Sequence, residues 1–296
     1  MPEHAPVDPV TLRLGGRSFG PGQFAVMAIV NRTPDSFADA GASYLLDAAL
    51  DRLDRVVAEG ADIVDVGGVK AGQGEPVSVA EELDRTEGYV ALTRERYPDL
   101  VISVDTWRAE VADRLCQVGA DLVNDTWAGH DPEVAAVAAA HRAGIVCSHT
   151  GGLPPRTDPR RVAYDDVMAS VIAGVSALAD RARAFGVPDE RILLDPTHDF
   201  GKNTQHSLEL TRRLPELVAL GLPVLVALSN KDFVGETLDL PVERRLPGTL
   251  AATAISAWHG ARVFRAHDVA ATRQVLDMVA SIRGTRPPAR NLRGLA

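Results

Sequence analysis

The chain has 296 residues, of which 46% are hydrophobic and 24% charged, a balance typical of a globular protein with a substantial core. Its formal net charge of −9 gives no electrostatic attraction to a phosphate backbone, so we expect no nucleic-acid partner. The N-terminal MPEHAPVDPV lacks the basic stretch and apolar run of a signal peptide, and no later segment has the ~18 uninterrupted apolar residues of a membrane helix. We therefore expect a cytoplasmic protein that does not associate with membranes.

Eight short apolar runs rich in Val and Ile recur along the chain. Their nearly continuous apolar character favours strands that are covered on both faces, as in a parallel sheet. The stretches between them have helical periodicity, for example LLDAALDRLDRVVAEG at 45–60 and RAEVADRLCQVGA at 108–120. The runs cover residues 24–31, 61–68, 100–106, 120–125, 144–149, 192–196, 223–229 and 261–267.

This alternation predicts a single α/β domain, a (β/α)8 TIM barrel over residues 23–284. The alternative, a doubly wound open sheet, usually has roughly five to seven strands and a glycine-rich turn after the first one. Here the first run ends in Asn31-Arg32-Thr33-Pro34, which favours the barrel. We expect residues 1–22 to have little structure of their own and residues 285–296 to form a tail. The glycines expected to end helices are Gly60, Gly119, Gly144, Gly186, Gly221 and Gly260.

Polar residues end almost every apolar run. In a barrel the carboxyl ends of the strands form the rim on which the active site lies, so these side chains are the candidate site. An isolated Asp at a strand end more often caps a helix or satisfies backbone groups. The joint occurrence of several of them with a lysine favours a binding site instead. The polar set includes Asn31, Asp65, Asp105, Asn124, Asp195, Ser229, Lys231, Arg265 and His267.

The hydrogen-bonding capacity of these groups indicates a ligand. Asp105, Asn124 and Asp195 offer acceptors and one amide, which suit a flat heterocycle with adjacent amino and ring N–H groups. Lys231 can donate to a ring carbonyl or nitrogen, and a pterin presents such an edge. A second group, Asn31, Arg265 and His267, can contact anionic oxygens, which favours a phosphorylated ligand.

A transition-metal site is the competing interpretation of the histidines. His149, His198 and His267 would have to converge, and a hydrolase barrel of that type is expected to carry a His pair after its first strand. No such pair is present.

Seven sequence blocks, in the same order, resemble the dihydropteroate synthase family. The resemblance covers about residues 24–284 and favours both the fold and the family. The blocks are NRTPDSF (31–37), ADIVDVGG (61–68), SVDTWRAEVA (103–112), ND (124–125), DP..DFGKN (195–203), LSNKDFVGETL (228–238) and GTLAATA with GARVFRAHDV (248–269).

The resemblance implies a transferase of folate biosynthesis that joins a dihydropterin diphosphate to 4-aminobenzoate with loss of diphosphate. It further implies Mg2+ as cofactor and a homodimer. Lys231, Arg265 and His267 would be the catalytic groups. Carried over by position, the pterin would be held by Asp105, Asn124, Asp195, Lys231 and Arg265, the diphosphate by Asn31, Arg265 and His267, the metal by Asn31, and 4-aminobenzoate by Phe37, Phe200 and Ser229.

Several positions depart from the family pattern. The usual Glu-Ser-Thr-Arg-Pro-Gly of the second loop is replaced by residues 69–74, VKAGQG, and the usual Ser-Arg-Lys is Ser229-Asn230-Lys231. The family's Asp-Pro-Gly is Asp195-Pro196-Thr197. These changes resemble a divergent second paralogue, so the alternative to a synthase is a catalytically weak or inactive pterin-binding protein. A third hypothesis, a transferase acting on methyltetrahydrofolate, is less favoured because NRTPDSF looks more like a synthase feature.

Overall fold

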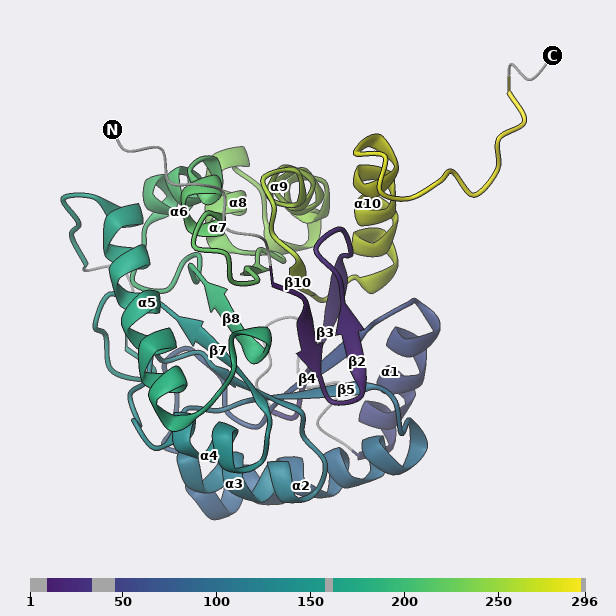
Figure 1. Cartoon of the computed structure of the whole chain (residues 1–296). Helices are drawn as coiled ribbons and strands as arrows, with labels where there is room; N and C mark the ends of the chain where they lie inside the picture. Colours follow the sequence, from purple (N-terminus) through teal and green to yellow (C-terminus); the bar gives the residue numbers. More distant parts are fainter. Residues whose placement is uncertain (1–9, 34–45, 158–161, 294–296) are drawn as a thin grey trace.

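The computed structural model describes residues 10–33, 46–157 and 162–293. Within them, eight parallel strands surround a central axis and helices cover their outer side (Figure 1). All eight predicted runs contain a strand. The barrel strands are β3 (Ala25–Asn31), β4 (Ile63–Gly67), β5 (Val101–Asp105), β6 (Leu122–Asp125), β7 (Gly144–Ser148), β8 (Ile192–Asp195), β9 (Leu225–Ala227) and β10 (Val263–Ala266).

The strand order is that of a TIM barrel. Neighbours in the sheet run β8-β7-β6-β5-β4-β3-β10-β9, and every pair is parallel. The two ends of this order meet at a parallel bridge between Leu194 and Val224, where the Leu194 N–H donates to the Pro223 carbonyl at 2.9 Å. The barrel is therefore confirmed and the open sheet is excluded.

The helices follow the strands along the chain, as the periodicity predicted. None of those in the described ranges combines the length and the apolar character that a membrane crossing requires. They are α1 (Leu46–Ala58), α2 (Val79–Arg96), α3 (Ala109–Gln117), α4 (Val134–Ala140), α5 (Val167–Phe185), α6 (Thr204–Arg212), α7 (Leu214–Val218), α8 (Asp232–Leu238), α9 (Leu246–Trp258) and α10 (Val269–Ile282), with short 3-10 helices η2 (Asp189–Arg191) and η3 (Val242–Arg244).

The N-terminal end of the barrel is closed by a hairpin that sequence analysis missed. Residues 1–22 were expected to have little structure, yet β1 (Leu12–Leu14) and β2 (Arg17–Phe19) pair in antiparallel fashion. Leu12, Leu14 and Phe19 are buried in one cluster with inward-facing residues of the barrel strands, such as Met27 and Ile63. The hairpin thus supplies the floor of the barrel interior.

One glycine shows how tightly this floor packs. Gly144 was predicted to end a helix in the left-handed conformation, but that conformation is found two residues earlier, at Arg142 (φ 54°). Gly144 is instead the first residue of β7, and a Cβ placed there would lie 2.5 Å from Leu14. A side chain at this position would displace the hairpin. The other five predicted glycines have positive φ, as expected: Gly60, Gly119, Gly186, Gly221 and Gly260.

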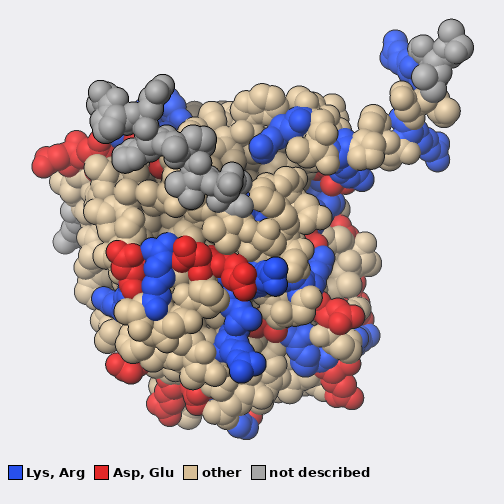
Figure 2. All heavy atoms as spheres, viewed as in Figure 1, with Lys and Arg blue, Asp and Glu red and all other residues tan. Residues whose placement is uncertain are grey.

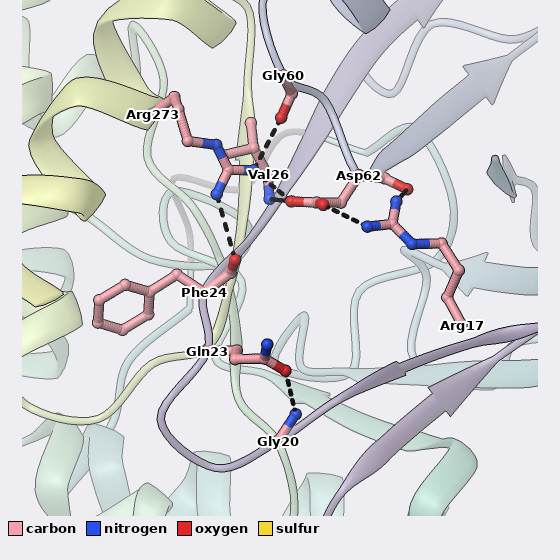
Figure 3. Close-up of polar contacts among 8 residues, drawn as sticks. All are labelled: Arg17, Gly20, Gln23, Phe24, Val26, Gly60, Asp62 and Arg273. Atoms are coloured by element: carbon pink, nitrogen blue, oxygen red, sulfur yellow. Dashed lines mark hydrogen bonds and ion pairs between the residues drawn. The ribbon is translucent and has the colours of Figure 1, made fainter. Parts of the chain in front are cut away.

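Asp62, directly before β4, anchors the floor to the barrel (Figure 3). Its carboxylate accepts from the Arg17 guanidinium at 2.8 Å, from the Val26 backbone N–H at 3.1 Å and from Arg273 of α10. Arg273 also donates to the Gly60 carbonyl at 2.8 Å. The hairpin, the first barrel strand and the last helix are therefore held by one carboxylate. On the face that carries the hairpin, basic and acidic side chains are intermixed (Figure 2).

The described part of the tail, residues 285–293, is exposed along its length and extends away from the barrel (Figure 1).

Candidate functional site

The alternation of side chains along each strand places polar groups directly above the floor. Ile63 faces the barrel interior, and two residues later Asp65 points to the same side. The same step leads from Leu122 to Asn124, and equivalent steps lead to Ser103, Asp195 and Arg265. The apolar lower layer of the barrel is thereby followed by a polar layer toward the carboxyl ends of the strands.

A cavity of about 370 Å³ opens above this polar layer. Of the ten residues to which sequence analysis gave a role in the site, nine line this cavity. The tenth, Phe37, lies outside the described residues. The nine are Asn31, Asp105, Asn124, Asp195, Phe200, Ser229, Lys231, Arg265 and His267.

Asp65 is a central residue of the site; sequence analysis placed it among the polar residues that end the apolar runs but gave it no role in ligand binding. It is fully buried, and its carboxylate accepts from Arg265 Nε at 2.6 Å, Asn124 Nδ2 at 3.2 Å and Ser103 Oγ at 2.6 Å. Arg265 also donates to Asp105 at 3.0 Å. A lone Asp within an otherwise apolar strand was the available signal, because a buried carboxylate requires partners.

The charge state of Arg265 follows from these contacts. Burial acts to lower its pKa, but the neighbouring carboxylates of Asp65 and Asp105 outweigh burial and hold the pKa above its ordinary value. Arg265 is therefore a fixed cation at the base of the cavity, oriented by two carboxylates.

Asp105 and Asp195, two of the aspartates that line the cavity, each accept a short hydrogen bond from a threonine. Thr126 donates its hydroxyl to Asp105 at 2.7 Å, and the Thr197 backbone N–H donates to Asp195 at 2.7 Å. Burial raises the pKa of Asp195 to about 6, and the Thr197 N–H opposes that rise. Burial also raises the pKa of Asp105, against the effect of Arg265. Both carboxylates would gain from a ligand that donates hydrogen bonds to them.

Lys231 lines the cavity from the start of α8. Its ammonium donates to the His198 carbonyl at 2.8 Å and lies 4.3 Å from the centre of the Phe200 ring. Phe200 in turn packs edge-on against Trp127, with ring centres 5.6 Å apart. Burial lowers the pKa of Lys231, and the nearby Asp199 carboxylate counteracts this. The ammonium thus borders an aromatic wall formed by Phe200 and Trp127.

Ser229 and His267 form a pair on the cavity wall. The two side chains are joined by a hydrogen bond of 3.0 Å between Ser229 Oγ and His267 Nδ1, and the His267 backbone N–H donates to the same hydroxyl at 3.2 Å. The pair connects the ends of β9 and β10.

Lys202 is a second residue whose importance the sequence analysis did not identify. Its buried ammonium donates to the carbonyls of His149 at 2.6 Å, Thr197 at 3.1 Å and Phe200 at 2.8 Å. These bonds connect the end of β7 to the loop after β8, which carries Phe200. Lys202 thereby fixes the loop that carries Phe200, part of the aromatic wall of the cavity.

The positions that depart from the family pattern also lie at the cavity. Val69, Lys70, Ala71 and Gly72 of the second loop line it. That loop is fastened by Arg156, whose guanidinium donates to the carbonyls of Gly72 at 3.1 Å and Glu75 at 2.7 Å. The altered loop is therefore part of the cavity wall.

Asn230 also lines the cavity, in the left-handed conformation with φ 57°. Its backbone N–H donates to Thr249 Oγ1 at 3.2 Å, and its carbonyl accepts from Arg245 at 2.9 Å. The backbone of this position is thus held from two sides, while its side chain is a neutral amide in place of the usual arginine.

Comparisons with known proteins agree with these features. Residues 27–267 match the model of a family described as Pterin binding enzyme. A Mycobacterium tuberculosis protein named Inactive dihydropteroate synthase 2 is 57% identical over 287 residues, which are 96% of this chain and 90% of that protein. A Synechocystis protein named Dihydropteroate synthase is 40% identical over 278 residues, 93% of each chain. Yersinia pestis dihydropteroate synthase, in a crystal structure with a sulfonamide drug complex, is 34% identical, with a TM-score of 0.87 over 93% of this chain and 99% of that one.

Proposed function

Because the chain belongs to the dihydropteroate synthase family of pterin-binding enzymes, as a divergent member, we propose that it binds a pterin and forms dihydropteroate weakly or not at all. The observation that carries pterin binding is that Asp105, Asn124, Asp195 and Lys231, from four different strand ends, line one cavity. Carboxylate, amide and ammonium groups together match the mixed donor and acceptor edge of a pterin ring.

Each group has a role in this proposal. The carboxylates of Asp105 and Asp195 accept from the amino and ring N–H groups, and Lys231 donates to the ring carbonyl. Asn124 already donates its amide N–H to Asp65, which leaves its carbonyl oxygen to accept from the ligand. Arg265, fixed by Asp65 and Asp105, would pack over the ring.

Two observations support weak or absent synthase activity. The M. tuberculosis relative named Inactive dihydropteroate synthase 2 is 57% identical to this chain, compared with 40% for the Synechocystis synthase. In addition, the second loop and Asn230 depart from the family pattern on the cavity wall itself. Catalysis depends on stabilising charge in the transition state, so the loss of a cationic side chain at this wall lowers the rate more than it lowers ring binding.

An active synthase is the second candidate. The observation that favours it is that the predicted aminobenzoate residues Phe200 and Ser229, together with His267, line the same cavity as the pterin set. Positioning both substrates in one cavity is a large part of the chemistry required.

Mg2+ would enter this site together with a diphosphate. Among the described residues, no group of three or more His, Cys, Asp or Glu side chains is arranged to hold a metal ion. Mg2+ bound to phosphates needs few protein ligands and keeps several waters, so Asn31 on the cavity wall would be enough as the chain's contribution. When bound, Mg2+ would neutralise charge on the departing diphosphate. Mg2+ should therefore raise the affinity for a pterin diphosphate and leave the affinity for an unphosphorylated pterin unchanged, and Asn31→Ala should remove that increase.

We further propose a cytoplasmic homodimer. Helices α9 and α10 pack against each other and carry large apolar side chains that are exposed, with Trp258 56% and Met278 61% exposed. Ile255 and Ile282 belong to the same two helices. Several exposed large apolar side chains on two packed helices are typical of a protein interface. Sedimentation should give twice the monomer mass, and Met278→Lys should shift the protein toward the monomer.

Calorimetry and a synthase assay on the same preparation separate the hypotheses. We expect a reduced 6-hydroxymethylpterin to bind, and the diphosphate, 4-aminobenzoate and Mg2+ to give little or no dihydropteroate. Rapid formation of dihydropteroate would establish the synthase. If no pterin bound to the demonstrably folded protein, the proposed function would be wrong.

A further inference from the structure

The lysines of this chain are few, and they gather at the cavity. Only three of the 31 basic residues are lysines, and all the others are arginines. Lys70 and Lys231 line the cavity, whereas Lys202 is 3% exposed and bonded to a residue of the wall, Phe200. An ammonium is a compact cation with three N–H donors, whereas a guanidinium is a planar fork. The buried position of Lys202 therefore raises the question of what an ammonium does there.

The surroundings of Lys202 match the three donors of an ammonium. The carbonyls of His149, Thr197 and Phe200 accept from it, one for each N–H group. A neutral amine has two N–H groups and a lone pair, so it would leave one of these carbonyls without a donor and facing the lone pair. The arrangement therefore requires the protonated form of Lys202.

The loop held in this way carries hydrogen-bond partners of two residues in the proposed pterin site. The Thr197 backbone N–H donates to Asp195 at 2.7 Å, and the His198 carbonyl accepts from Lys231 at 2.8 Å. The same loop carries the Phe200 ring, whose centre is 4.3 Å from the Lys231 ammonium. A shift of this loop would therefore disturb Asp195 and Lys231 together.

Several ionisable groups interact with the Lys202 ammonium. Burial lowers its pKa to about 7, and the Asp195 carboxylate opposes this. The imidazoles of His149 and His198 stay neutral in this range, because burial lowers the pKa of each to about 3. Lys202 can therefore lose its proton near neutral pH, while the imidazoles add no charge. The interacting groups, from the ends of β7 and β8, the loop after β8, α6 and the start of α8, are His149, Asp195, His198, Asp199, His206 and Lys231.

From these contacts we propose that Lys202 is a positioning residue for the pterin site, and that ligand affinity depends on its staying protonated. The inference rests on the proposed pterin binding. Lys202 acts through the loop, which orients Asp195 and Lys231. Loss of the proton leaves one loop carbonyl without a donor, and the loop no longer holds both groups in place for the ring. Binding should therefore weaken as the pH rises above about 7.

Calorimetry with 6-hydroxymethyl-7,8-dihydropterin at a series of pH values tests the inference. For the unmodified protein we expect the Kd to rise by about tenfold between pH 7 and pH 9, the effect of one lost charged hydrogen bond. Lys202→Met should raise the Kd about tenfold at pH 6.5 and remove this alkaline rise. Lys202→Gln keeps two N–H donors, so it should weaken binding less at pH 6.5 and also remove the rise.

Nuclear magnetic resonance of protein labelled with 13C at the lysine Cε shows which ammonium loses its proton. Three lysines give three signals, and Lys70→Met and Lys202→Met assign them. We expect the Lys202 signal to titrate near pH 7 in the free protein and at higher pH with the ligand bound.

Tyr164→Phe is the matched control, because the Tyr164 hydroxyl donates to the Gly201 carbonyl in the same loop at 2.7 Å. This variant removes a loop hydrogen bond without removing an ammonium, so it should keep the alkaline rise in Kd. Thermal unfolding adds a second distinction. Because the native pKa of Lys202 lies below the ordinary 10.5, its contribution to stability rises with pH above about 7, while affinity falls. A merely structural role would lower stability and affinity together.

The outcomes separate this inference from the proposed function. An alkaline rise in Kd that persists in Lys202→Met, a Kd that is the same at pH 7 and pH 9, or a Lys202 signal that does not titrate below pH 9 would overturn the inference and leave pterin binding intact. If Lys202→Met does not fold, the unmodified protein and Lys202→Gln still decide between these outcomes. Absence of binding at pH 6.5 by the folded, unmodified protein would instead defeat the proposed function, and the inference with it.

Discussion

Asp62, directly before β4, lies at the floor of the barrel, whereas Asp65, within β4, lies below the cavity, and the two differ in what they hold. Asp62 on the floor binds Arg17, the Val26 backbone and Arg273, which fasten the hairpin and α10 to the strands. Asp65, three residues later, is fully buried and holds Asn124 and Arg265, which both line the cavity. The same residue type thus holds the fold together at the floor, as Asp62, and arranges ligand-binding groups at the cavity, as Asp65.

The backbone shows the same contrast between the two ends. Seven non-glycine residues in the described ranges have positive φ, and five of them are in loops that follow barrel strands. Strain of this kind is concentrated where a site must be preorganised. The floor, in contrast, is an apolar cluster in which Leu12 and Leu14 are almost completely buried. The five loop residues are Ala128, Arg156, Thr197, Asp199 and Asn230.

The largest effect should come from removing Asp65. Asp65→Ala leaves Arg265 with one carboxylate partner and Ser103 and Asn124 without this acceptor, so the free energy of unfolding should fall by about 3–5 kcal/mol. Pterin binding should be lost as well. Urea unfolding and calorimetry measure the two effects. Asp62→Ala is the control from the other end of the barrel. Because the Asp62 carboxylate is 16% exposed, its removal should lower the free energy of unfolding by less. Equal losses of stability and of pterin binding in the two variants would contradict the difference between the two ends.

A floor substitution should destabilise without affecting the ligand. Leu12 is completely buried in the lower cluster, so Leu12→Ala should lower the free energy of unfolding by about 2–4 kcal/mol. The Kd for a reduced pterin should stay within about twofold of the unmodified value, because the polar layer lies above this cluster. A large change in Kd at a temperature where the variant is folded would show that the two ends are coupled.

Lys231→Met should weaken ligand binding and leave stability almost unchanged, the reverse of the result expected for Leu12→Ala. Loss of a charged hydrogen bond should raise the Kd for a reduced pterin by about 10- to 100-fold. Stability should change by no more than about 1 kcal/mol, because burial already disfavours the ammonium and an apolar chain of similar size avoids that cost. Lys70→Met, on the second loop, removes the same charge from the lining and should have a much smaller effect on the Kd. Comparable effects of both variants would indicate that only net charge matters.

The smallest effect is a pH dependence. The pKa of Asp195 is about 6, so its carboxylate becomes protonated below that pH and no longer accepts from the ligand. The Kd should therefore rise by about tenfold per pH unit below pH 6, and Asp195→Asn should flatten the profile by that amount. For folding the sign is reversed: because the native pKa lies above the ordinary 3.8, the Asp195 contribution to stability falls as pH rises from about 4 to about 6. A Kd that is independent of pH in calorimetry would contradict the proposed role of Asp195.

The sequence by itself determined the barrel and the list of polar rim residues. Strand-forming runs and helical periodicity are local patterns, and parallel strands in a barrel bring their carboxyl ends to one face. Asp105, Asn124, Asp195 and Lys231 could therefore be assigned to one site before any distance was known.

Only the tertiary structure decided which residues support that site. The hairpin strands have three residues each, too few for a recognisable pattern, and they are buried by strands far away in the chain. Asp65 acts through Arg265, which is 200 residues away in the sequence. Lys202 acts through the carbonyl of His149, which is 53 residues away. The charge that Asp199 brings to Lys231 likewise depends on a loop conformation stabilised by contacts with two helices. Such roles are set by distances between segments, and a linear pattern carries no information about those distances.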